Sequence, residues 1–251
     1  MIELRAVGGI PEITPGMDLP ALIAEGAARL DVLPGDIVCV AHKIVSKAEG
    51  RMVALADVIP GPAALELAKT NTKDPRLLEL ILRESRKIVR RRGSLLVCET
   101  HQGFICANAG IDASNVPDGH VVLLPVDADR SARHIQAAVS AAVGGRVGVV
   151  ITDTHGRAFR KAIINVAIGI AGFDAVVDHR GGFDREGRML VATEQALGDE
   201  LAAAAGILMD KGGGYPVVLV RGVATAPAPG TVGDLVRAEE HDLFRTDAGM
   251  G

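Results

Sequence analysis

The stretch Val147-Gly148-Val149-Val150-Ile151-Thr152-Asp153-Thr154-His155-Gly156-Arg157 carries the strongest local pattern in the sequence. Its first five residues are apolar or glycine and predict a buried strand. We expect this strand to end in a carboxylate and a hydroxyl, Asp153 and Thr154, before a turn followed by basic residues. Oxygen ligands on rigid backbone suit a hard divalent cation, and nearby cations suit a phosphate. The alternative is that Asp153 caps a helix with a basic exposed face. The basic residues are Arg157, Arg160 and Lys161.

Other segments supply the rest of a mixed α and β pattern. Apolar runs predict strands at 36–41, 94–98 and 217–220. Helical spacing occurs at 19–30, around 77–81 and at 135–142, and the clearest helix is predicted from about 193 to 209. Strands and helices alternate too irregularly for a simple βαβ repeat, and no segment has the composition of a flexible linker between domains.

Composition excludes several classes of protein. The chain has 251 residues, 48% hydrophobic and 23% charged, with a net charge of −4, which allows a large core in one or two domains. Mild negative charge and 2% aromatic residues argue against nucleic-acid binding. We expect no signal peptide and no membrane span. Three cysteines without CxxC spacing fit a reducing compartment, so a cytoplasmic protein is expected.

Common catalytic motifs are absent from the sequence. It contains no GxxxxGK[ST], GxGxxG, HExxH or GxSxG pattern. The sequence therefore lacks the main signature of four enzyme classes: P-loop NTPases, simple dinucleotide-binding domains, zincins and α/β-hydrolases. Any phosphate chemistry must use another scaffold.

Three further segments could carry chemistry, and each has a structural alternative. Segment 108–115 places Asp, Ser and Asn in a turn. Their oxygens could bind a metal ion or substrate, or the segment is an ordinary Asx turn. Segment 42–51 follows a strand and has cations suited to phosphate, or it is a charged surface turn. Segment 209–216 is glycine-rich, which allows close backbone approach to a ligand or simply ends a helix.

Several other polar residues are expected to have no catalytic role. We expect a solvated turn at 90–92, a solvated helix face at Asp199 and Glu200, and inert buried thiols at the three cysteines. The histidines without common metal spacing are taken as ordinary: His101, His120, His134, His179 and His241.

In order along the chain, these segments resemble the coenzyme F420-0:L-glutamate ligase family. The resemblance rests on 9–12, 46–51, 108–115, 151–157, 199–202 and 216–222. It implies an α+β fold of two intertwined subdomains, in one family domain over 1–251 without a C-terminal nitroreductase-like domain. It also implies a homodimer.

The resemblance implies a specific reaction. GTP would convert the terminal carboxylate of the F420-0 precursor into an acyl phosphate, and the amine of L-glutamate would then form an amide. Further glutamates would be γ-linked. Such chemistry depends on positioning and charge neutralisation, so no side-chain nucleophile is expected.

Site residues follow from the same resemblance. Mn²⁺ or Mg²⁺ would be held by Asp112, Asp153 and Thr154. Lys211 stands where some relatives have a metal-binding carboxylate, so Asp210 is the candidate substitute. The nucleotide site would include Gly9, Ile10, Pro11, Glu12, His42, Lys43, Lys47, Asn115, Met209, Asp210, Lys211, Gly212, Gly213, Gly214 and Tyr215.

Two other functions remain open at the level of the sequence. One is a related ligase that glutamylates a different carboxylate. The other is a non-catalytic nucleotide-binding regulator, which would have no need for the metal-binding residues. The partners expected in the leading case are small molecules, without nucleic acid or membrane.

Overall fold

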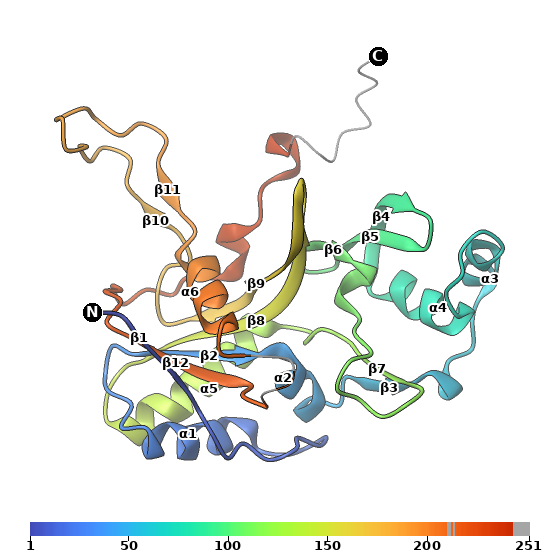
Figure 1. Ribbon diagram of the computed structural model, residues 1–251, viewed down its shortest axis with the longest axis horizontal. Coiled ribbons are helices and arrows are strands. Elements are labelled where there is room, and N and C mark those ends of the chain that lie inside the picture. The colour runs from blue at the N-terminus through green and yellow to red at the C-terminus, as the bar shows by residue number, and fades with distance from the viewer. Residues whose placement is uncertain (210–211, 213, 243–251) are drawn as a thin grey trace. The chain divides into compact units, whose positions relative to one another are not determined.

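The computed structural model describes residues 1–209, 212 and 214–242 and divides into two compact units (Figure 1). Unit 1 contains 1–51 and 124–235. Unit 2 contains 52–123 and, among the described residues, 236–242. The chain therefore leaves the first unit, builds most of the second and returns.

Unit 1 is built on a mixed five-stranded sheet. Its strand order is β1 (Glu3–Ala6), β12 (Val217–Arg221), β2 (Ile37–Ala41), β8 (Gly148–Arg157) and β9 (Arg160–Ala171). β2 and β8 are parallel, and the other neighbours are antiparallel. β2 and β12 are buried along almost their whole length, which explains their continuous apolar sequences.

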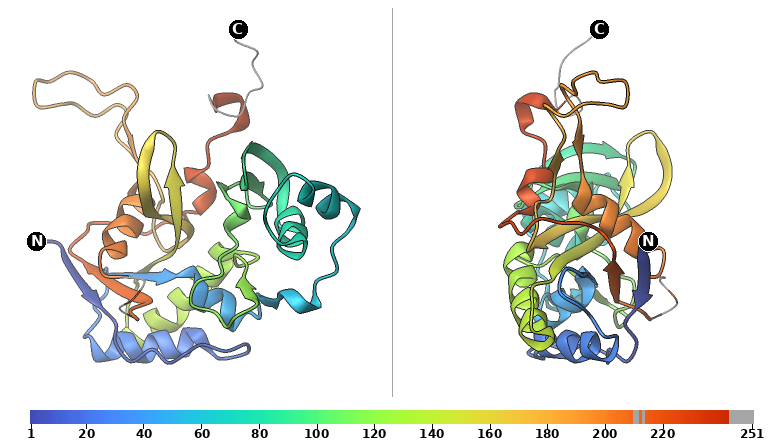
Figure 2. Two further views of the ribbon diagram at one scale, coloured as in Figure 1. Left: turned by 45° about the vertical axis from the view of Figure 1, so that its right-hand side comes forward. Right: turned by 90° about the vertical axis from the view of Figure 1, so that its left-hand side faces the viewer.

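Helices cover both faces of this sheet (Figures 1 and 2). α5 (Ala128–Val143) packs on one face with α1 (Leu19–Arg29) beside it, and α6 (Leu197–Gly206) packs on the other. Two glycines make this close packing possible. A Cβ on Gly169 of β9 would lie 2.6 Å from the Ala128 backbone, and one on Gly198 of α6 would lie 2.5 Å from Ile170 Cδ1.

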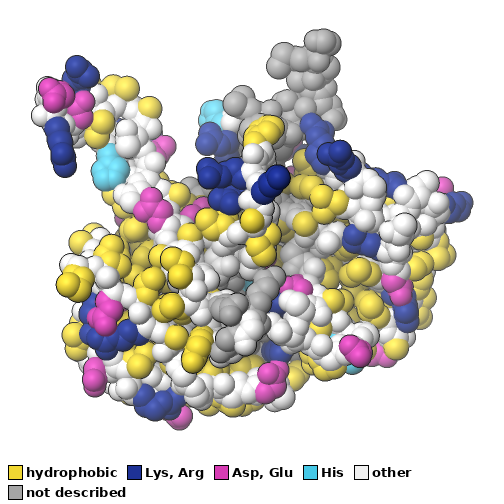
Figure 3. Space-filling view, viewed as in Figure 1, with side chains coloured by type: hydrophobic (Ala, Val, Ile, Leu, Met, Phe, Trp, Pro, Cys, Tyr) yellow, Lys and Arg dark blue, Asp and Glu magenta, His cyan; other side chains and the backbone are white. Residues whose placement is uncertain are grey.

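Two shorter features complete unit 1. α2 (His42–Ala48) follows β2 without an intervening loop. A hairpin arm, residues 177–195, begins and ends in β10 (Val177–Asp178) and β11 (Glu194–Gln195). Figure 3 shows charged and apolar side chains mixed along this arm, where Phe183, Met189 and Val191 are exposed.

Unit 2 has a core of its own. β4 (Ser85–Arg92), β5 (Leu95–Thr100) and β6 (Ile105–Ala107) form an antiparallel sheet, and β3 (Met52–Ala54) pairs with β7 (His120–Val122). The helices are α3 (Pro62–Ala68) and α4 (Pro75–Arg83). Leu78 and Ile81 of α4 pack with Leu96 and Cys98 of β5 in a fully buried cluster.

The α+β fold class is confirmed, and all four predicted strands are present. Two local predictions were wrong. The strand begun at 147–151 continues to Arg157, because Asp153 and Thr154 pair with β9. The clearest helix starts at Leu197 rather than near Thr193, because Glu194 and Gln195 pair with β10.

Arg90–Arg92 are exposed as predicted, but they end strand β4 rather than form a turn.

Across the described part of the chain, no helix is both long and apolar enough to cross a membrane.

Candidate functional site

Asp153 is a buried carboxylate in the middle of β8, only 8% exposed. Its Oδ1 accepts a hydrogen bond from Thr154 N at 2.6 Å, and its Oδ2 accepts one from His155 Nε2 at 3.1 Å. The register between Ile151 and Thr152 shifts by one residue, which leaves Ile168 of the partner strand β9 as the extra residue of a bulge. Bulges are common next to sites, and this one lies just before the single carboxylate of β8.

His42 approaches the same carboxylate from the neighbouring strand. Ala41 pairs with Thr152 in the parallel ladder, so the first residue of α2 comes beside Asp153. His42 Nε2 lies 3.1 Å from Asp153 Oδ1. This contact does not have the geometry of a hydrogen bond, and among the described residues Nε2 has no hydrogen-bond partner. On the other side of the ring, Nδ1 lies 3.4 Å from Ser46 Oγ.

These neighbours keep Asp153 ionised. Burial alone raises the pKa of a carboxyl group, but His42 and His155 outweigh burial and hold the pKa of Asp153 far below its ordinary value. An ionised carboxylate can only accept hydrogen bonds, so His155 carries its proton on Nε2. The structure therefore contains a buried, fixed negative charge.

Thr154 and Asn165 extend the polar cluster across the β8–β9 pair. Thr154 Oγ1 donates to Asn165 Oδ1 at 3.2 Å, and these residues are register partners. Asn165 Nδ2 lies 3.4 Å from Thr152 Oγ1. Both Thr152 Oγ1 and Asn165 Nδ2 also contact the sulfur of Met209, at 3.6 and 3.7 Å. The start of the predicted glycine loop thus lies beside the cluster.

Lys47 and Glu12 form a second polar contact in unit 1. Lys47 Nζ donates to Glu12 Oε1 at 2.6 Å, although the lysine is buried and the glutamate side chain is 78% exposed. This contact joins α2 to the 9–12 turn, where Gly9 has a φ of +74°. α2 is largely buried, so the alternative of a charged surface turn at 42–51 was wrong for this helix.

Asp112 and Asn115 lie in unit 2. Asp112 Oδ1 accepts from Ser114 N at 2.7 Å, and Oδ2 accepts from Ser114 Oγ at 2.9 Å. Asn115 has a φ of +57°. This is the Asx turn considered above, and it also holds two carboxylate oxygens in a defined orientation.

Comparison with known proteins decides the family. The family model for F420-0:Gamma-glutamyl ligase matches residues 8–222. A coenzyme F420:L-glutamate ligase of Halobacterium salinarum is 44% identical, covering 96% of this chain and 94% of that protein. The enzyme of Methanothermobacter thermautotrophicus is 43% identical, covering 97% of this chain and 99% of that protein. The enzyme of Methanopyrus kandleri is also 43% identical, covering 93% of this chain and 94% of that protein.

The chain belongs to the F420-0:gamma-glutamyl ligase family. Within this family fold, the structure brings together His42, Asp153 and Thr154, and separately Glu12 and Lys47. Of the predicted glycine loop, Gly212, Gly214 and Tyr215 are exposed. Asp210, Lys211 and Gly213 lie outside the described residues.

Sequence reasoning missed three members of this ligase's polar cluster. His155 lies in the 151–157 segment and Ser46 in the 42–51 segment, but neither was predicted to lie beside Asp153 or His42. Asn165 lies in a β-branched strand segment, where an amide side chain is unusual and could have drawn attention. Asp199 was expected on a solvated helix face, which was wrong: it is half-buried, and its Oδ1 accepts from Ala167 N at 2.9 Å.

The donor set in the ligase fold suits a hard divalent cation. Asp153 supplies a buried anionic oxygen and Thr154 a hydroxyl, and the unpartnered His42 Nε2 shows that polar atoms here have unused capacity. Within the described residues, no three His, Cys, Asp or Glu side chains are already arranged to hold a metal. Asp153 fits the cation as one ligand. The side chain of Thr154 lies on the opposite face of β8, against Asn165, so Thr154 remains a predicted ligand, and the rest of the shell is not formed by these residues.

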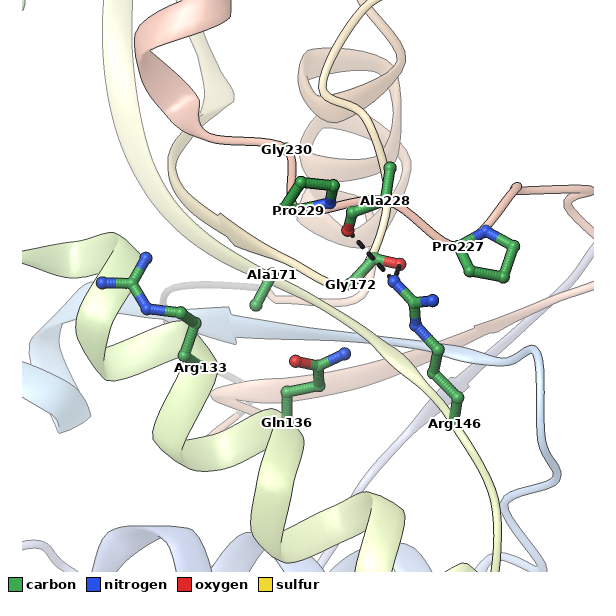
Figure 4. A pocket seen from close by; sticks show the side chains of 9 residues that line it. All are labelled: Arg133, Gln136, Arg146, Ala171, Gly172, Pro227, Ala228, Pro229 and Gly230. Atoms are coloured by element: carbon green, nitrogen blue, oxygen red, sulfur yellow. Dashed lines mark hydrogen bonds between the residues drawn. The ribbon is translucent and has the colours of Figure 1, made fainter.

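A separate hollow of about 480 Å³ lies at the other end of β8 (Figure 4). Arg146 crosses it and donates to the carbonyl oxygens of Gly172, at 2.5 Å, and Ala228, at 3.0 Å. None of the predicted site residues lines it. Because Arg146 fastens the 227–230 segment to the end of β9, we assign this hollow a structural role.

Proposed function

We propose that this protein is a GTP-dependent ligase that adds L-glutamate to the coenzyme F420-0 precursor with the help of Mn²⁺ or Mg²⁺. The observation that carries the proposal is a buried, ionised Asp153 beside Thr154, in a chain that belongs to the F420-0:gamma-glutamyl ligase family over nearly its whole length. The relatives are named for adding L-glutamate to coenzyme F420, and the family is named for F420-0 as the acceptor.

The proposed reaction has two steps, phosphorylation of the precursor carboxylate and formation of the amide. A carboxylate oxygen of the precursor attacks the γ-phosphorus of GTP, the bond to the β-phosphate oxygen breaks, and GDP leaves. The deprotonated amine of glutamate then attacks the acyl carbon, the bond from that carbon to the phosphate oxygen breaks, and inorganic phosphate leaves with one proton from the amine as the amide forms. Asp153, with Thr154 as a predicted further ligand, would hold the divalent cation, which when bound would neutralise phosphate charge. Asp112 remains a predicted further ligand.

Other residues of this chain would bind and orient the nucleotide. Lys47, held by Glu12, presents a fixed cation at the buried end of α2, where a phosphate oxygen could replace the glutamate. The glycines of the 209–215 loop would let backbone N–H groups approach the nucleotide. No side chain needs to act as a nucleophile, because positioning and charge neutralisation supply the catalysis.

The direct test is incubation with the F420-0 precursor, L-glutamate, GTP and Mn²⁺, followed by mass spectrometry. We expect products heavier by one or more glutamyl residues, with GDP formed in equal amount. Replacing GTP by ATP, and Mn²⁺ by Mg²⁺, tests each part of the proposal. Absence of any glutamyl product with every metal and nucleotide would overturn it.

A further inference from the structure

The carboxylate of Asp153 has an imidazole on each of its oxygens. His42 Nε2 lies 3.1 Å from Oδ1, and His155 Nε2 lies 3.1 Å from Oδ2. The side chains of His42, His155 and Asp153 are 3%, 13% and 10% exposed. Each oxygen of Asp153 therefore has an imidazole ring against it, and the two rings come from different elements.

Each imidazole is fixed by a different element. His42 opens α2, and Ser46, one turn further along that helix, contacts its Nδ1. His155 lies two residues beyond Asp153 on the same strand, so both side chains are on the same face of β8. The charge of Asp199, at the start of α6, also acts on His155.

These contacts restrict the rotation of Asp153. A carboxylate that is free to rotate about χ2 must lose that freedom when it binds a cation. Here the backbone N–H of Thr154 donates to Oδ1 and His155 Nε2 donates to Oδ2, while the His42 ring lies against Oδ1 at 3.1 Å and limits its movement. In metal sites, groups that hydrogen-bond to a ligand orient it and tune its affinity.

We infer that His42 and His155 are positioning residues that hold the Asp153 carboxylate ready for a divalent cation. This inference rests on the proposed use of Mn²⁺ or Mg²⁺ by this ligase. It gives His42 a different role from the nucleotide contact predicted from the sequence, since its ring is turned to Asp153 inside the protein.

The test measures Mn²⁺ binding directly, by the loss of the electron paramagnetic resonance signal of free Mn²⁺. The variants are His155→Leu and His42→Leu, which remove the ring nitrogens, and His155→Gln and His42→Gln, which keep an N–H donor. We expect the leucine variants to bind Mn²⁺ about 10–100-fold more weakly. The glutamine variants should bind more tightly than the leucine variants.

Matched measurements separate positioning from a general structural effect. His134→Gln changes an exposed histidine of α5 and should bind Mn²⁺ like the wild type. Circular dichroism checks that each variant is folded. If a leucine variant does not fold, His155→Ala with added free imidazole replaces it, and added imidazole should restore Mn²⁺ binding. In steady-state assays, the Mn²⁺ concentration for half-maximal rate should rise, while the KM for GTP at saturating Mn²⁺ stays unchanged.

The possible failures can be told apart. Folded leucine variants that bind Mn²⁺ within twofold of the wild type would overturn the positioning role and leave the proposed ligase function intact. A wild-type protein that binds neither Mn²⁺ nor Mg²⁺, with or without GTP, would overturn the proposed metal use, and the inference with it.

Discussion

The buried negative charge of Asp153 is tolerated because two histidines, positioned by neighbouring strands of the sheet, lie against it. His155 follows it on the same strand, and His42 comes from the neighbouring strand. Removing one of these histidines leaves the carboxylate charge of Asp153 less well neutralised inside the protein. Such a loss usually lowers the free energy of unfolding by more than the whole ion pair contributes to it. Substitutions at this cluster are therefore expected to affect both stability and activity.

Asp153→Asn is the most informative single substitution for activity. Loss of the anionic oxygen should lower kcat at saturating Mn²⁺ by roughly 100-fold, because one such charge contact is worth about 3 kcal/mol in the transition state. Steady-state kinetics of glutamate addition measure the effect. Asp178→Asn on the exposed arm is the control and should leave kcat unchanged. Turnover of Asp153→Asn near the wild-type rate, even in limiting Mn²⁺, would rule out the assigned role.

The sequence could predict Asp153 and Thr154 but not the whole cluster around them. Both are polar residues that directly follow an apolar run, and this pattern can be recognised from the local sequence alone. The contact between His42 and Asp153 depends on β2 and β8 being parallel neighbours with Ala41 opposite Thr152. Which strands become neighbours is decided by the packing of the whole sheet, and a local pattern does not contain that information.

Between elements, α5 and β9 are joined by an unusually close contact and a half-buried carboxylate, that of Asp129. Gly169 lets the Ala128 backbone approach β9. Asp129, in the first turn of α5, accepts from Ile170 N at 2.7 Å and from Val232 N at 3.2 Å. β9 is an edge strand of the sheet, so this side chain satisfies a backbone donor that no strand pairs with.

Gly169→Ala should destabilise the protein through this contact. The new Cβ would lie 2.6 Å from both the carbonyl carbon and oxygen of Ala128, so α5 or β9 must shift. We expect a loss of about 1–3 kcal/mol in the free energy of unfolding. Thermal unfolding should show a Tm lowered by about 2–4 °C for each kcal/mol. The matched control is Gly156→Ala on β8, where a Cβ meets no atom within 4 Å; an equal loss in both variants would contradict the explanation.

Asp129 should make stability depend on pH in a predictable direction. Burial raises the pKa of Asp129 above its ordinary value of 3.8, although two backbone N–H groups lower it in part. The folded protein thus holds this proton more tightly than the unfolded chain. The free energy of unfolding should therefore fall as pH rises from 3.8 through the raised pKa.

Asp129→Asn removes this titration and provides the measurement. The difference in Tm, wild type minus variant, should become more negative as pH rises from about 4 to 7. Glu200→Gln, at an exposed position of α6, should leave the wild-type pH profile unchanged. A Tm difference that is constant over this range would show that Asp129 does not titrate there.

For the whole molecule, the α+β class and the family could be predicted from the sequence, and the resemblance also implied two intertwined subdomains, but the positions at which the chain crosses between them could not be predicted. No linker composition marks the crossings near residues 51 and 124, because both lie beside regular elements. The arm at 177–195 was also missed, since its paired strands are only two residues long. Strands this short leave no alternating pattern to detect.

The protein is predicted to be a homodimer. The prediction comes from the family resemblance, and the apolar side chains exposed on the arm are of the kind that interfaces cover. Multi-angle light scattering at micromolar concentration should give twice the chain mass of 26.0 kDa. The mass of a single chain under these conditions would contradict it.

The strand order of unit 1 also determines when its sheet can form during synthesis on the ribosome. β12 lies between β1 and β2, yet it is made last of the five strands, after residue 216. At about 5–20 residues per second, β1 leaves the ribosome on the order of ten to forty seconds before its partner exists. Unit 2, whose elements between 52 and 123 are contiguous, can fold in that interval. The apolar strand β2, which must wait for both β8 and β12, is therefore the segment that most needs protection by chaperones until translation is nearly complete.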